Sequence, residues 1–199
     1  MEFPYTVEYT SNKNAYVRIS EEGKVVFRIP HWLKHDEALF HKLQEKAEIL
    51  RKKHESRPKI EKRNEEGVLL FGEFVPWEEV IQNPWKTYSD KQIEKLLKEI
   101  LIEYVTEYVK IFSTKIGEKY QSITIKKSKT KRWSCSYDQK LMFNLSLIFL
   151  PGEYIQYVVA HEVAHLQVKN HKTDFWKLVE HLFPRYKIVR KKLKNLIIL

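Results

Sequence analysis

The first thirty residues alternate between apolar and polar positions, which is the pattern of half-buried β-strands. The segments TVEYT, AYVRIS and VVFRIP carry this alternation, and EEGK between the last two has the composition of a turn. Apolar residues then recur at helical spacing from Glu37 to Lys53, and Asp36 is placed to cap that helix. The pattern predicts an N-terminal lobe of strands with one helix.

A longer helical stripe dominates the middle of the chain. Apolar residues at helical spacing run from Asp90 to Ile116, and Gly117 is suited to the left-handed conformation that ends a helix. VLLFGEFV before this helix reads as a strand, and PWEEVIQNPW reads as a loop. SITIKK and KLMFNLSL after the helix read as two further strands joined by a basic loop.

The last third of the chain reads as short helices. One is predicted from Pro151 and Gly152 to about Val168, a second from Thr173 to Leu182, and a basic third that begins after Pro184. We therefore expect a β-rich lobe with one helix over residues 1–87 and a catalytic region over 88–199, either separate or joined in one compact unit.

Composition narrows the class of protein. The 199 residues are 43% hydrophobic, so the chain can bury a proper core, and its one cysteine, Cys135, excludes an internal disulfide. No signal-like or membrane-spanning apolar run is visible, which predicts a cytoplasmic protein with no membrane partner. The net charge of +10 would attract nucleotides or nucleic acid, although a generally basic surface explains it equally well. Nothing in the sequence indicates the oligomeric state.

Candidate chemistry gathers in the segment VVAHEVAHLQVKNHKTDFW. His161 and His165 are four residues apart in a predicted helix, so their imidazoles lie on one face and point to a common position. Two imidazole nitrogens about 2.0–2.1 Å from one ion is an arrangement that zinc takes from a helix. Glu162 lies about 100° further round, away from the ligand face but able to reach a water held by the metal.

His171 is the expected third ligand. It follows His165 by six residues, so the chain must leave the helix and turn back. Asn170 tolerates the left-handed conformation at a helix end, and Thr173 or Asp174 can cap the next helix. A catalytic zinc keeps three protein ligands and one open position. Three imidazoles also suit copper, nickel, cobalt or iron, and availability favours Zn²⁺.

This constellation is typical of a metallohydrolase. The metal lowers the pKa of its water and polarises the substrate carbonyl, while Glu162 takes a proton as general base and delivers it to the leaving group. The sequence therefore predicts a zinc-dependent hydrolase, most simply a metallopeptidase with a peptide or protein substrate. That substrate is expected to extend by β-addition along an edge strand near Leu141 to Leu145.

The same segment resembles a known family. HEVAHLQVKNHKTDFWKLVEHLFPRYK is similar to the YgjP-like metallopeptidase signature, H-E-L-x-H-L-x-x-x-N-H-x-x-x-F-W followed by a proline, acidic and tyrosine cluster. KTKRWSCSYDQKLMFNLSLIFLPGEYIQYVV resembles the segment that precedes it there. The resemblance covers most of the chain and is specific from Lys131 to Lys187. It implies Glu162 as catalytic base and three zinc ligands: His161, His165 and His171.

The fold implied by this resemblance is an α+β, zincin-like metallopeptidase core whose sheet lies over the HExxH active-site helix. SprT-like proteases, which act on DNA–protein crosslinks, are implied as more distant relatives. The chain departs from these patterns at several positions. The family's glycine between Trp133 and Ser134 is absent, and Arg185 replaces the acidic residue after Pro184. Val168 replaces the glycine of the metzincins, and no methionine follows the helix, which excludes a true metzincin.

Other residues near the motif have open roles. Asp174 could orient a ligand imidazole, although an acid at a helix N-terminus is also favoured by the helix dipole. Tyr186 could donate to a developing oxyanion. Cys135 could bind the metal but is expected to be a small buried hydrophobe. Phe175 and Trp176 are expected to anchor the second short helix to the core.

Two rival functions are open at this point. The metal centre could hydrolyse a phosphoanhydride, as in a nucleoside triphosphate pyrophosphatase, with the basic loop from Lys126 to Arg132 holding the phosphates. Alternatively, the chain could be a nucleic-acid-associated SprT-like protease or a binding module with a structural metal. Structural zinc is usually closed by four ligands, and the sequence offers no convincing fourth.

Overall fold

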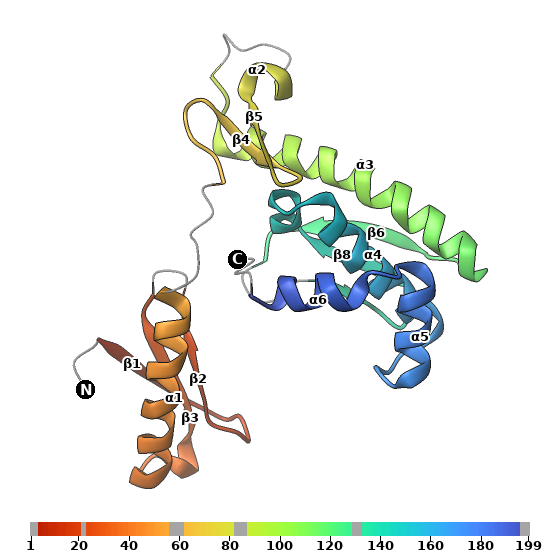
Figure 1. Cartoon of the computed structure of the whole chain (residues 1–199). Helices are drawn as coiled ribbons and strands as arrows, with labels where there is room; N and C mark the ends of the chain where they lie inside the picture. Colours follow the sequence, from red (N-terminus) through yellow and green to blue (C-terminus); the bar gives the residue numbers. More distant parts are fainter. Residues whose placement is uncertain (1–3, 21–22, 56–61, 82–86, 129–132, 196–199) are drawn as a thin grey trace. The chain divides into compact units, whose positions relative to one another are not determined.

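The computed structural model describes residues 4–20, 23–55, 62–81, 87–128 and 133–195, and Figure 1 shows its helices and strands. The chain divides into two compact units, Met1–Lys59 and Ile60–Leu199. The boundary predicted between residues 87 and 88 falls inside the second unit. Part of the predicted loop PWEEVIQNPW (82–85) and of the basic loop (129–132) lies outside the described residues.

The smaller unit is a sheet covered by one helix. Its strands are β1 (Tyr5–Thr10), β2 (Tyr16–Ile19) and β3 (Val25–Pro30), followed by the 3₁₀ helix η1 (His31–Leu33) and by α1 (Glu37–Glu55). The strand order is β1-β3-β2, with β1 parallel and β2 antiparallel to β3. Asp36 Oδ1 accepts a hydrogen bond from the Leu39 amide at 2.8 Å, which confirms the predicted N-cap of α1. The core of this unit consists of Val17, Val25, Phe27, Ile29, Leu43 and Ala47.

The larger unit is organised around two packed helices, α3 (Asp90–Ile116) and α4 (Gly152–Gln167). Ser89 and Gln92 form a capping box at the start of α3, and Gly117 ends it with φ 71°, as the sequence predicted. Gln156 of α4 donates to the hydroxyls of Tyr104 and Tyr108 on α3, at 2.9 and 2.8 Å. These bonds and the apolar stripe of α3 hold α4 in place.

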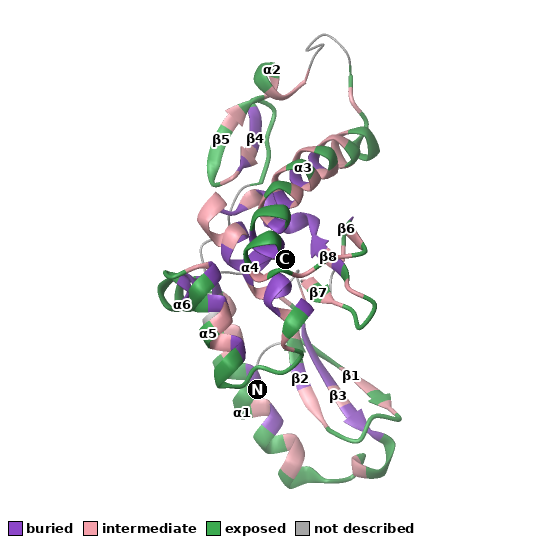
Figure 2. Cartoon of the chain, turned by 90° about the vertical axis from the view of Figure 1, so that its right-hand side faces the viewer, coloured by how far each residue is buried: buried purple, intermediate pink, exposed green. Residues whose placement is uncertain are grey.

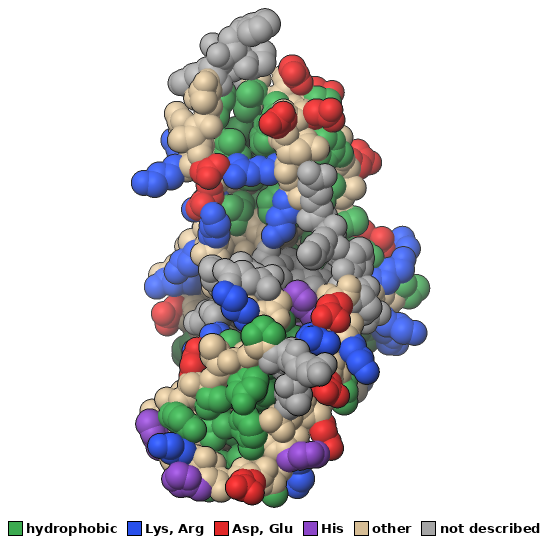
Figure 3. All heavy atoms as spheres, turned by 90° about the vertical axis from the view of Figure 1, so that its left-hand side faces the viewer, with side chains coloured by type: hydrophobic (Ala, Val, Ile, Leu, Met, Phe, Trp, Pro, Cys, Tyr) green, Lys and Arg blue, Asp and Glu red, His purple; other side chains and the backbone are tan. Residues whose placement is uncertain are grey.

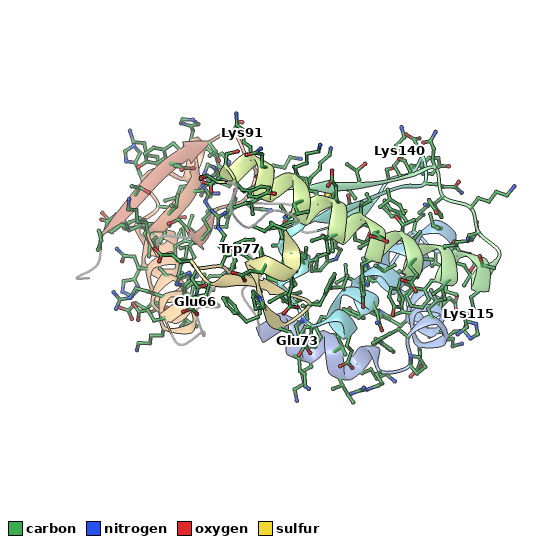
Figure 4. All side chains as sticks on the ribbon, turned by 90° about the horizontal axis from the view of Figure 1, so that it is seen from above. Glu66, Glu73, Trp77, Lys91, Lys115 and Lys140 are labelled. Atoms are coloured by element: carbon green, nitrogen blue, oxygen red, sulfur yellow. The ribbon has the colours of Figure 1, made fainter. Side chains whose placement is uncertain are left out.

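The segment VLLFGEFV is a hairpin, whereas the sequence predicted one strand. β4 (Gly67–Leu70) pairs antiparallel with β5 (Glu73–Pro76), because Phe71 and Gly72 take positive φ values of 52° and 90° and reverse the chain. The one-turn helix α2 (Trp77–Val80) follows, and the Trp77 amide donates to the carbonyl of Glu66 (Figure 4). Val68 and Leu70 are buried in the same core as α3 and α4, so this hairpin belongs to the larger unit.

A second sheet faces the motif helix. β6 (Ser122–Lys126), β7 (Trp133–Cys135) and β8 (Lys140–Asn144) have the order β6-β8-β7, with β6 parallel and β7 antiparallel to β8. The sequence did not predict β7. Because β8 lies between the other two strands, the expectation that residues 141–145 form an edge strand is wrong. The edge next to α4 is β7, and the 3₁₀ helix η2 (Leu145–Phe149) continues from β8.

Helices α5 (Thr173–Leu182) and α6 (Tyr186–Asn195) both pack against α4. Lys115, labelled in Figure 4, donates from the end of α3 to the carbonyl of His181 on α5 at 2.8 Å. Figure 2 shows buried residues concentrated along α4 and β8, and along β3 in the smaller unit. Among the described residues, none of the helices combines the length and apolar character needed to cross a bilayer. The predicted α+β class, with an N-terminal sheet and an HExxH helix, is confirmed.

Candidate metal centre

The two histidines of α4 lie on one face of that helix, as their spacing predicts. The ring centroids of His161 and His165 are 5.0 Å apart, and both rings are partly exposed to a pocket. The residues around them on α4 are buried, including Val158, Val159 and Val163. The rest of the helix is therefore fixed in the core, which gives both imidazoles a rigid base.

His171 joins these two rings. Its Nε2 lies 3.1 Å from Nε2 of His165 and 3.1 Å from Nε2 of His161. Four tetrahedral ligands at about 2.0–2.1 Å from a zinc ion are separated from one another by roughly 3.3 Å. In the described part of the chain, these residues are the one group of three or more histidine, cysteine or acidic side chains whose ligand atoms lie close enough to hold one ion.

The turn that brings His171 back to the two histidines of α4 differs from the one predicted from the sequence. Helix α4 ends because Val168 is extended, with φ −121° and ψ 108°. Asn170 does not have a positive φ; its Oδ1 instead accepts from the Lys172 amide at 3.1 Å. Lys172 is the N-cap residue of α5 and makes no side-chain cap bond, so neither Thr173 nor Asp174 caps this helix. The turn depends on extended backbone and an Asx bond.

The tautomer of His165 suits metal binding. Its Nδ1 lies 3.0 Å from the carbonyl oxygen of Val168, and a carbonyl can only accept, so Nδ1 carries the proton and Nε2 keeps its lone pair. Burial lowers the pKa of His165, and burial together with the neighbouring histidines lowers the pKa of His161 to about 3. Both rings are therefore neutral near pH 7, which is the form that binds a metal.

Glu162 is buried beside this site. Its Oε1 lies 3.9 Å from Nε2 of His161, and its Oε2 has no hydrogen-bond partner. Burial raises the pKa of Glu162 to about 8, while a hydrogen bond from the backbone of Cys135 acts in the opposite direction. A buried carboxylate with one free oxygen beside three converging imidazoles is suited to exchange a proton with a neighbouring water.

Phe175 forms the apolar support beneath the three imidazoles. It is fully buried, and its ring centroid lies 4.9 Å from that of His161, 4.4 Å from that of His165 and 4.7 Å from that of His171. Phe175, which was predicted to anchor the second short helix to the core, therefore packs against the three histidine rings. It fills the space behind the ligand rings, so that they face the pocket.

The three rings open into a pocket of about 380 Å³. Strand β7 forms one wall through Trp133, Ser134 and Cys135, and the end of α4 forms the other, with Lys169 at its exposed end. Burial raises the pKa of the Cys135 thiol, and its Sγ contacts the carbonyl of Ser136. Cys135 is half-buried and lines the pocket, whereas the sequence predicted a small buried hydrophobe, and it is not one of the clustered metal ligands among the described residues.

Asp174 and Tyr186 lie away from the pocket lining. Asp174 is exposed, and in the described part of the chain no hydrogen bond joins it to a ligand histidine. Tyr186 is 6% exposed and stacks on Trp176, with ring centroids 5.6 Å apart and planes at 12°. Arg185, which replaces the family's acidic residue, pairs with Glu153 at 3.3 Å.

The donor set fits a metal ion of the zinc type. Three imidazole nitrogens converge, the pocket offers a free side for a fourth ligand, and among the described residues the buried Oε2 of Glu162 has no hydrogen-bond partner. Polar atoms left unpaired in a buried site are expected where a bound ion and its solvent complete the structure.

Comparison with known proteins agrees with this geometry. The YgjP-like metallopeptidase domain matches residues 72–196, more than half of the chain, and leaves the smaller unit outside the match. No curated protein matches. Among solved structures, the chain is similar to the metallopeptidase zymogen abylysin of Pyrococcus abyssi, at 23% identity over 45% of this chain and 90% of that one, with a TM-score of 0.41.

It is also similar to the metallopeptidase zymogen jannalysin of Methanocaldococcus jannaschii, at 21% identity over 46% of this chain and 94% of that one, with a TM-score of 0.42. At these TM-scores the likeness bears on neither activity nor substrate. The family match covers β5, the second sheet and all four residues of the metal centre. The chain therefore belongs to the YgjP-like metallopeptidase family.

Proposed function

We propose that this protein is a zinc-dependent peptidase with His161, His165 and His171 as metal ligands and Glu162 as general base. One observation carries the proposal: Nε2 of His171 lies 3.1 Å from the Nε2 atoms of both His161 and His165, beside a buried carboxylate and facing an open pocket. When bound there, zinc supplies Lewis acidity that activates water and polarises a carbonyl.

The role of Glu162 follows from its position. As the oxygen of water bonds to the peptide carbonyl carbon, one proton of that water passes to the carboxylate of Glu162. The carboxylate then returns the proton to the amine nitrogen as the C–N bond breaks. Burial keeps bulk water from competing for this proton, and the Cys135 backbone hydrogen bond fixes the orientation of the carboxylate.

The substrate is proposed to extend along β7. Ser136 donates to the carbonyl of Lys140 at 2.9 Å, so the alternation of an antiparallel ladder directs the backbone groups of Ser134 toward β8 and those of Trp133 and Cys135 away from it. The outward amide of Cys135 is used by Glu162. The backbone of Trp133 therefore remains to pair with an extended peptide next to the metal ligands.

The test is a peptidase assay on the full chain with a casein-like mixture of peptides, before and after removal of metal with a chelator. We expect cleavage that disappears with the chelator and returns with zinc. The Glu162→Gln variant should bind zinc and fold but lose turnover by at least about 100-fold. Full activity of this variant would overturn the assigned role of Glu162.

Phosphoanhydride hydrolysis is the main rival reaction. The described part of the basic loop gives it little support, because Lys127 is already paired with Glu94 at 2.9 Å, and residues 129–132 lie outside the described residues. Nucleoside triphosphates assayed in parallel with the peptides separate the two reactions. Pyrophosphate release that depends on zinc and on Glu162, without peptide cleavage, would replace the peptidase proposal.

A nucleic-acid-associated role rests on the charge of the chain. Figure 3 shows Lys and Arg side chains interspersed with Asp and Glu on the visible face. Mixed charges of this kind favour a solvated basic surface over a dedicated phosphate-binding stripe. A structural metal is also disfavoured, since the histidine cluster in the described residues supplies three ligands and leaves one position for solvent or substrate.

A further inference from the structure

The third proposed ligand, His171, lies outside any helix, whereas the other two lie within α4. His161 and His165 lie on α4, but His171 lies in the exposed segment between α4 and α5. Its carbonyl accepts a hydrogen bond from Nε1 of Trp176 at 3.0 Å, and its ring stacks on the Trp176 ring at 5.9 Å with planes at 30°. Trp176 therefore contacts both the backbone and the imidazole of His171.

Trp176 is in turn held by one face of α6. Tyr186 stacks on its ring at 5.6 Å, and the Arg190 guanidinium lies 4.2 Å from its ring centroid. Tyr186 and Arg190 are four residues apart, so they share one face of the helix. Trp is the best of the aromatic rings at binding a cation over its face, and Arg is more often the cation than Lys.

Arg190 differs from the other arginines in the described part of the chain. Each of the others forms an ion pair with a carboxylate: Arg18 and Arg28 with Glu8, Arg51 with Glu55, Arg63 with Asp90, and Arg185 with Glu153. Within the described residues, Arg190 has no such pair and contacts Trp176 instead. It is half-buried, so its stacking on the indole accounts for its placement.

The position of Arg190 is electrostatically unfavourable for a cation site. Its guanidinium lies 4.2 Å from the Trp176 ring centroid, and that centroid lies 5.8 Å from the centroid of His161, so the charge of Arg190 lies within electrostatic reach of the ligands. A positive charge near a metal site repels the metal ion. If Arg190 increases metal affinity, its contact with Trp176 must therefore contribute more than its charge repulsion costs.

We propose that Trp176, clamped by Tyr186 and Arg190 of α6, is a positioning residue that holds His171 in the geometry of the third metal ligand. In this arrangement the C-terminal helix contributes to metal affinity without touching the metal. The inference rests on the proposed metal site but not on the identity of the substrate. Loss of support around a ligand commonly reduces metal affinity by roughly 10- to 100-fold.

The Arg190→Gln variant tests this proposal, because the two possible effects have opposite signs. Electrostatic repulsion alone predicts tighter zinc binding once the charge is removed, whereas loss of the clamp predicts weaker binding. We expect the zinc Kd, measured by competition with a chromophoric chelator on the full chain, to rise by about 10-fold. Arg190→Lys, which keeps a cation over the indole, should recover part of the affinity.

Lys191→Gln is the matched control, since Lys191 is exposed on the same helix and carries the same charge. It should leave the Kd unchanged or slightly lower. Trp176→Phe provides an independent test: it keeps an aromatic ring but removes the donor to the His171 carbonyl, and should also weaken zinc binding. The visible absorption of the cobalt-loaded variants should show altered coordination, and thermal unfolding of the metal-free proteins reports whether each variant folds.

An unchanged or lower zinc Kd in both Arg190→Gln and Trp176→Phe, with wild-type zinc binding intact, would overturn the positioning role and leave the peptidase proposal standing. Weaker zinc binding in both variants, with the expected change in cobalt coordination, supports it even if no peptide is cleaved. A wild-type chain that binds no zinc would overturn the metal site and this inference together.

Discussion

Oε1 of Glu162 lies 3.9 Å from Nε2 of His161, although the two residues are neighbours in sequence and point in different directions from α4. Both side chains line the same pocket. Among the described residues, neither Nδ1 of the histidine nor Oε2 of the carboxylate has a hydrogen-bond partner. The site thus places a potential base next to a potential ligand with no bond between them that would have to be broken before reaction.

The raised pKa of Glu162 predicts a pH-dependent stability difference in the metal-free protein. Its pKa in the folded protein, about 8, exceeds its ordinary value of 4.5. The folded state therefore binds this proton more tightly than the unfolded state, so the contribution of Glu162 to the free energy of unfolding is greatest below pH 4.5 and is lost as the pH rises toward 8. Glu162→Gln does not titrate. The stability of the wild type relative to the variant should therefore fall between pH 5 and pH 8, by up to about 4 kcal/mol.

Urea unfolding of both proteins with chelator present measures this difference. Equal changes in the free energy of unfolding of the two proteins across this range would show that the carboxylate is not buried as described.

His171 should be required for metal binding but not for folding. It is exposed, so His171→Ala removes a ligand without opening a hole in the core. We expect zinc affinity to fall by at least about 100-fold and peptidase turnover to be lost, with the melting temperature of the metal-free protein nearly unchanged. His181→Ala is the control, because His181 is an exposed histidine of α5 outside the metal cluster. Normal zinc binding by the His171 variant would remove it from the ligand set.

The close approach of Gly152 on α4 to Tyr104 on α3 should leave no room for a larger side chain at position 152. A Cβ at Gly152 would lie 2.6 Å from the Tyr104 hydroxyl, and the Tyr104 ring is held between Phe71 and Tyr108 at 4.7 and 4.9 Å. Gly152→Ala should therefore lower the free energy of unfolding by about 1–3 kcal/mol.

Adding Tyr104→Phe removes the clashing oxygen and should recover part of this loss, at the expense of the bond from Gln156. A double-mutant cycle by urea unfolding measures the coupling. Additive losses in the double variant would contradict a direct clash.

The exposed edge of β7 should determine how tightly peptides bind. Trp133→Pro removes an outward amide, and Trp133→Ala removes the same side chain while keeping that amide. We expect the proline variant to have a KM about 2- to 10-fold above that of the alanine variant, with similar kcat, because one substrate hydrogen bond is lost. Steady-state kinetics on one peptide tests this. Equal KM values would exclude substrate pairing at Trp133.

Local sequence determined a large part of this structure. The bounds of α3 follow from its capping residues and helical periodicity, which depend on neighbours three or four positions away. Helical periodicity also predicts α5, although that helix has no side-chain cap. The pairing of His161 with His165 follows from the same geometry of the helix. The H-E-x-x-H motif therefore indicated two of the three candidate ligands, and the longer segment from Lys131 to Lys187 indicated the family, without any knowledge of long-range contacts.

Tertiary structure decided what depends on residues distant in the chain. The edge strand is β7 and not β8, because strand order depends on the packing of the whole sheet. The return of His171 relies on extended Val168 and on Trp176, and the support of Trp176 comes from Arg190, fourteen residues later on another helix. Backbone periodicity carries no information on such contacts, since they form only when separate helices and strands bury their apolar faces together.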